Sequence, residues 1–141
     1  MRKAKKNLKV IKTTKAIVLK KIKIRNAKIP YLISFTRKVF NKNTNQILRK
    51  VSKKFKNKVA VRSSSIMEDQ EKKSYAGHFK SFLNIEKRNQ RLLKLKINEV
   101  FNSFNLKKKY DERNEVIIQD MVNGVALSGV ATSCDKDNFT P

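Results

Sequence analysis

The stretch that decides the fold lies at residues 59–85 and reads Val-Ala-Val-Arg-Ser-Ser-Ser-Ile-Met-Glu-Asp-Gln-Glu-Lys-Lys-Ser-Tyr-Ala-Gly-His-Phe-Lys-Ser-Phe-Leu-Asn-Ile. It opens with a short apolar run at 58–61, which predicts a strand that stops at Arg62 and three serines. The arginine offers a forked cation, and the serines offer hydroxyls and accessible backbone N–H groups, which together suit phosphate binding. The alternative is a surface arginine beside an ordinary strand-to-loop turn.

The second half of this stretch predicts a mobile flap between two strands. An acidic pair, Glu68 and Asp69, begins a polar run that ends in two small residues, Ala76 and Gly77. Apolar character then returns at 79–85, as expected for a further strand. Adjacent acidic residues in a polar loop point different ways, so solvation explains the pair better than acid-base catalysis.

These residues carry a resemblance that covers all 27 positions of the stretch. Val-Arg-Ser-Ser, Glu-Asp, Ser-Tyr-Ala-Gly and Phe-Leu-Asn-Ile resemble, in type and spacing, the ATP-binding domain of the phosphoenolpyruvate synthase and pyruvate phosphate dikinase family. The resemblance implies an ATP-grasp fold. It also implies that Arg62 is catalytic and binds the nucleotide with Ser63 and Ser64, and that Ala76 and Gly77 contact it from the flap.

The residues before this stretch predict a helix, a strand and a second helix. Thr13-Thr14-Lys15-Ala16, followed by apolar residues, indicates a capped helix start. The family has a lysine at the start of its first helix that touches the nucleotide phosphates, and Lys15 stands at that place; a solvated lysine is the alternative. Residues 31–35 predict a buried strand and 36–55 an amphipathic helix, a crossover long enough for parallel pairing with the strand at 58–61.

A second block of resemblance follows residue 85. Residues 87–107 predict an amphipathic helix, and 115–122 with 125–131 predict a hairpin around Asn123-Gly124. Gln119, Met121 and Val122 match the strands that line the adenine pocket in the family. A core role is the alternative for Met121, and an ordinary polar strand position is the alternative for Gln119.

The resemblance also defines the expected organisation and activity. We expect an α/β (α+β) fold, with a basic segment at 1–12 and a partial ATP-grasp domain at 13–141 that holds the N-terminal subdomain and the start of the second. In the family, ATP phosphorylates a histidine and then pyruvate or another acceptor, with Mg²⁺ held by carboxylates and a glutamine that lie downstream of this sequence. A second chain or a downstream segment would complete the site, and this chain alone is expected to be inactive.

Composition leaves one rival function open. The formal net charge is +24, and residues 1–60 hold 21 of the 35 Lys and Arg and none of the 11 Asp and Glu. A non-enzymatic basic protein that binds nucleic acid or another polyanion is therefore the alternative, although no arginine-rich helix or ribonucleoprotein motif supports readout. A general bias toward lysine and asparagine on solvated faces would explain the same charge.

The cysteine and histidine counts and the length of the apolar runs narrow the class of protein. One cysteine, Cys134, and one histidine, His78, exclude a disulfide framework and the usual zinc sites. No apolar run approaches the roughly 18 residues that span a bilayer. We therefore expect a cytoplasmic protein without a membrane partner.

Overall fold

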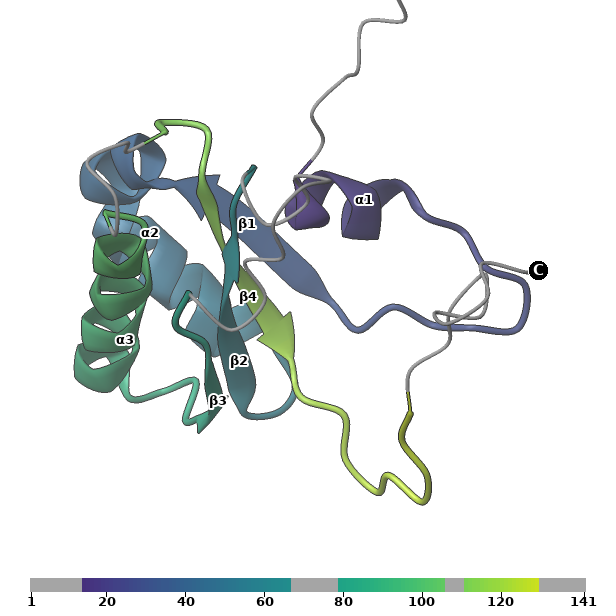
Figure 1. Ribbon diagram of the computed structural model, residues 1–141. Coiled ribbons are helices and arrows are strands. Elements are labelled where there is room, and N and C mark those ends of the chain that lie inside the picture. The colour runs from purple at the N-terminus through teal and green to yellow at the C-terminus, as the bar shows by residue number, and fades with distance from the viewer. Residues whose placement is uncertain (1–13, 67–78, 106–110, 130–141) are drawn as a thin grey trace, which may run out of the picture.

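A computed structural model describes residues 14–66, 79–105 and 111–129 (Figure 1). The basic segment at 1–12 and the flap at 67–77 lie outside the described residues, and so do Ala76 and Gly77. The described residues form helices and strands in the order α1 (Lys15–Lys21), β1 (Leu32–Thr36), α2 (Arg37–Lys54), β2 (Val59–Ser64), β3 (Phe82–Ile85), α3 (Gln90–Ser103) and β4 (Glu115–Asp120).

The strands form one antiparallel sheet in the order β1-β4-β2-β3. The last strand, β4, lies in the interior of the sheet because its Val-Ile-Ile run at 116–118 is apolar on both faces and is fully buried. It is antiparallel to β1 and to β2, so those two run the same way without bonding each other. The predicted parallel pairing of these two strands was therefore wrong. The expected fold class was α/β (α+β), and the antiparallel sheet makes this an α+β fold.

Helices α2 and α3 cover one face of the sheet, and α1 lies on the other face (Figure 1). The core between the two helices and the sheet is rich in aromatic side chains. The Phe40 ring stacks on Phe35 with 5.4 Å between centroids, and Phe101 lies 6.0 Å from Phe40. Alternate residues of β2 and β4, including Val61 and Val116, complete this core.

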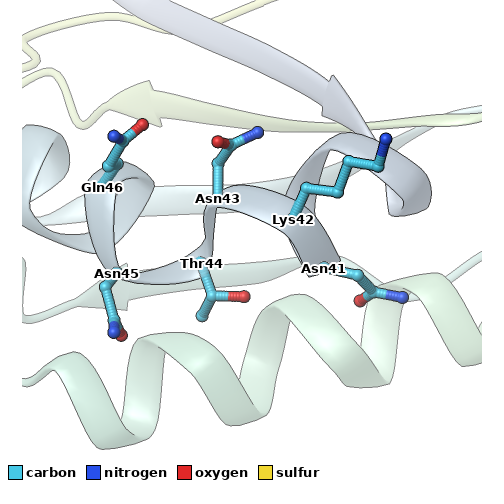
Figure 2. A pocket seen from close by; sticks show the side chains of 6 residues that line it. All are labelled: Asn41, Lys42, Asn43, Thr44, Asn45 and Gln46. Atoms are coloured by element: carbon cyan, nitrogen blue, oxygen red, sulfur yellow. The ribbon is translucent and has the colours of Figure 1, made fainter.

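Helix α2 bends at Asn43, whose φ of −128° is not helical. The Asn43 amide donates to the Val39 carbonyl and the Thr44 hydroxyl donates to the Phe40 carbonyl, so side chains compete for backbone acceptors at the bend. A hollow of about 230 Å³ lies beside it, lined by residues 41–46 (Figure 2). Its lining is polar, and none of the candidate site residues contributes to it.

Most predicted elements are present with shifted bounds. Both N-terminal helices and the strand between them are confirmed, whereas α3 is shorter than the predicted 87–107. The strand predicted to stop at Arg62 instead continues to Ser64, because β4 pairs with it along its full length. Residues 121–129 contain no strand, so the hairpin prediction was wrong in this part of the chain.

Candidate functional site

The candidate site residues of β2 do not all lie on one face of the sheet. Side chains alternate along a strand, and Val61 faces the α2–α3 core, so Arg62 and Ser64 belong to the opposite face and Ser63 to the core side. Ser63 is 4% exposed. Arg62 is half-buried on the face where α1 lies.

Arg62 and Gln119 contact each other across the β2–β4 pair. Arg62 Nη1 donates to Gln119 Oε1 at 3.0 Å. In the strand register Arg62 is opposite Ile117 and Gln119 is opposite Ala60, so the two polar side chains are diagonal neighbours on one face. This bond uses one of the five N–H donors of the guanidinium. A residue of each resemblance block therefore meets at this point of the sheet.

The start of α1 is attached to the same face. The Ala16 N–H donates to the Ser64 hydroxyl at 2.9 Å, and both residues are fully buried. The Ile17 and Val18 N–H groups bond the side chain and the carbonyl of Thr14. Since these backbone donors are already used, an anion at this helix start would be bound by side chains such as Lys15, which is half-buried in the first turn.

Sequence reasoning missed Glu115, which joins α1 to β1. The Thr14 hydroxyl donates to Glu115 Oε2 at 3.1 Å, and the Ser34 hydroxyl donates to Oε1 at 2.7 Å. Lys20 Nζ in turn donates to Ser34 Oγ at 2.6 Å. The available signal was an acidic residue at the head of an apolar strand, in a sequence with few carboxylates.

The adenine-wall candidates Met121 and Val122 lie just beyond the end of β4. The Met121 N–H donates to the Lys58 carbonyl at 2.9 Å, and its own carbonyl accepts from the Asn57 side chain at 3.2 Å. Its side chain is half-buried, whereas Val122 is 59% exposed. Neither is in the sheet, but both follow directly from the strand that carries Gln119.

The described residues do not fit a magnesium site. Within 14–66, 79–105 and 111–129, no group of three or more His, Cys, Asp and Glu side chains is clustered. Glu115 accepts from two hydroxyls, and Asp120 accepts from the Lys56 and Asn57 backbone N–H groups at 3.1 and 3.2 Å. Both strand carboxylates therefore already have structural partners.

Comparison with known proteins gives a family. A family model described as the pyruvate phosphate dikinase AMP/ATP-binding domain matches residues 4–140. No curated protein and no solved structure matches the chain. In the part of the chain that the structure describes, no helix is both long and apolar enough to cross a membrane.

Proposed function

The chain belongs to the pyruvate phosphate dikinase AMP/ATP-binding domain family, and on that premise we propose that it is the ATP-binding part of a phosphotransferase that resembles phosphoenolpyruvate synthase and pyruvate phosphate dikinase. The observation that carries the proposal is the shared face of Arg62, Gln119 and the α1 start, which are joined by the Arg62–Gln119 and Ala16–Ser64 bonds. Arg62 and Lys15 bind the phosphates, and Gln119, Met121 and Val122 border the adenine.

The roles of the serines differ in this proposal. Ser64 holds the α1 start through its hydroxyl, so it supports the phosphate site by placing Lys15. Ser63 faces the core and contributes through its backbone groups. Ala76 and Gly77 remain proposed contacts from the flap.

The proposed chemistry rests on positioning and charge neutralisation. Arginine and lysine side chains on a half-buried face can stabilise charge on a transferring phosphoryl group. In this proposal a second chain or a further segment supplies the magnesium ligands, the phosphohistidine domain and the acceptor site; among the described residues, no group of three or more carboxylate, histidine or cysteine side chains is clustered. In this proposal the chain by itself binds nucleotide, and phosphotransferase activity requires the complete assembly.

A titration of the purified chain with ATP by calorimetry at physiological salt tests the binding proposal. We expect saturable binding of ATP and weaker binding of adenosine, because Arg62 and Lys15 act on the phosphates, which adenosine lacks. Adenosine binding as tightly as ATP, or no saturable ATP binding, would refute it. Incubation with labelled ATP, Mg²⁺ and pyruvate should give neither AMP nor phosphoenolpyruvate, and clear AMP formation would show that the chain has a complete site.

A second candidate function, polyanion binding, is favoured by the outer face of α2. Six cations of this helix are exposed, and no ion pair between described residues involves them: Lys38, Lys42, Arg49, Lys50, Lys53 and Lys54. Helix α2 lies on the face of the sheet opposite α1 (Figure 1), and Arg62 belongs to the α1 face by strand alternation, so the two functions are separable. If this surface makes six phosphate contacts, its affinity for duplex DNA should fall by about 10³ when the salt concentration rises from 50 to 200 mM.

A matched pair of variants tests this surface. Four α2 cations are changed to glutamine in one variant, namely Lys42, Arg49, Lys50 and Lys53. Four exposed cations on and after α1 are changed in the other, namely Lys21, Lys23, Arg25 and Lys28. We expect the α2 variant alone to flatten the salt dependence of DNA binding, by a slope of about 3.6 for four phosphates. An equal decrease of the salt-dependence slope in both variants would show that net charge, and not the α2 surface, causes binding.

A further inference from the structure

Helix α1 depends on the contacts at its first turn. It has seven residues, and an isolated helix of that length is unstable in water. Its N-terminal cap is Thr14, which is 3% exposed, and its first residue is Lys15. Whatever fixes Thr14 on the sheet therefore fixes the position of Lys15.

Glu115 is the residue that fixes Thr14. It is the first residue of β4, and its two carboxylate oxygens accept one hydroxyl each, from Thr14 on one side and from Ser34 of β1 on the other. The Thr14 hydroxyl also accepts the Ile17 N–H, and the Ser34 hydroxyl also accepts from Lys20. Both hydroxyl protons are thus directed at the Glu115 side chain. A carboxylate accepts at both of its oxygens, whereas the amide of glutamine has only one acceptor oxygen.

The strand register connects this carboxylate to the proposed phosphate site. Glu115 is the register partner of Ser64 across the β2–β4 pair, and Ser64 accepts the Ala16 N–H. The two fixed points of α1, at Thr14 and at Ala16, therefore come from one pair of strand residues, and Lys15 lies between them. Arg62 lies two residues before Ser64 on the same face.

From this geometry we infer that Glu115 is a positioning residue, which docks α1 on the sheet and so holds Lys15 on the face that carries Arg62. The inference rests on the proposed function only for the role of Lys15 toward ATP. The docking of α1 by Glu115 is a separate claim, which can be tested without nucleotide.

Amide hydrogen exchange tests the docking. In Glu115→Gln one hydroxyl loses its acceptor, so the amides of Ala16 and Ile17 should exchange about tenfold faster while those of α3 keep their rates. Thr14→Val, which keeps the shape and removes the hydroxyl, should do the same. Glu99→Gln is the matched control, because Glu99 lies on α3 and bonds Lys96 and not α1. Unchanged exchange at Ala16 in both variants would overturn the docking role.

A double-mutant cycle on ATP affinity tests the positioning. If Glu115 acts through Lys15, then Glu115→Gln and Lys15→Ala should each weaken ATP binding about tenfold, and the double variant should be no weaker than Lys15→Ala. Adenosine affinity should not change, because it has no phosphates. Losses that multiply to about a hundredfold would overturn the positioning role.

The outcomes separate the two proposals. If exchange at Ala16 is faster in the variants but the unmodified chain does not bind ATP, the docking of α1 by Glu115 stands and the proposed function is overturned. ATP binding that depends on Lys15 but not on Glu115 would leave the proposed function in place and overturn this inference.

Discussion

Replacement of Arg62 by alanine is the most direct test of the nucleotide site. The side chain is half-buried, and its Nη1 is fixed 3.0 Å from Gln119 Oε1. The other N–H donors of the fork can bind two phosphate oxygens side by side. Loss of a hydrogen bond to a charged group costs about 1.5–3 kcal/mol. The Kd for ATP should therefore rise by about 10- to 150-fold.

A lysine at this position separates charge from geometry. Arg62→Lys keeps the positive charge but loses the planar fork, so we expect it to recover little of the lost affinity. Full recovery by lysine would show that the site needs only a point charge. The adenosine affinity of both variants should stay unchanged, since the cation acts on the phosphates.

The structure also gives the control for folding. In Arg62→Ala the Gln119 side chain, 9% exposed, loses its partner, and an unsatisfied buried acceptor costs about 1–3 kcal/mol. Each variant therefore needs a thermal denaturation curve beside its calorimetric titration. Arg88→Ala, at an exposed arginine in the turn before α3, is the matched control. A folded Arg62→Ala protein whose Kd for ATP lies within twofold of the unmodified chain would remove Arg62 from the site.

Three further predictions concern stability and its dependence on pH. Phe101→Ala should lower the free energy of unfolding by about 3–5 kcal/mol in urea titrations, because the ring is fully buried among the core aromatics; a loss below 1 kcal/mol would contradict this packing. Ser64→Ala should cost about 1–3 kcal/mol, because the buried Ala16 N–H loses its acceptor; unchanged stability would show that the hydroxyl does not hold α1. The hydrogen bond from Lys96, with the charges of Lys96 and Lys80, lowers the pKa of Glu99 below its usual 4.5. Its stabilising contribution is therefore present above pH 4.5 and is lost as the pH falls further. Glu99→Gln should flatten stability against pH only in that acid range, and a change confined to neutral pH would count against the assignment.

The sequence by itself determined the local elements and the family. The Thr14 cap, the apolar spacing of α2 and the Val-Arg-Ser-Ser string are local signals, because side-chain periodicity and capping depend on neighbours within a few residues. The family assignment, now supported over residues 4–140, came from the same strings of residues.

Only the tertiary structure decided the order of the strands. Pairing of β1 with β4 joins residues about 80 positions apart, such as Ser34 and Ile117. Nothing in a window of ten residues distinguishes that pairing from a parallel β1–β2 pair. Burial favours the observed order: the Val-Ile-Ile run of β4 is apolar on both faces, and a position between β1 and β2 in the interior of the sheet is where both faces of a strand are best covered.

The position of β4 between β1 and β2 also brings the candidate site residues together. Arg62 was predicted at a strand end with its serines, but pairing with β4 carries β2 on to Ser64 and directs Ser63 to the opposite face. It also brings Gln119 to Arg62 and Glu115 to Thr14, contacts that span 57 and 101 residues of sequence. Residue types and spacing could indicate which side chains have the right chemistry. Their division between two faces of one sheet depends on strand register, which is set by the whole core.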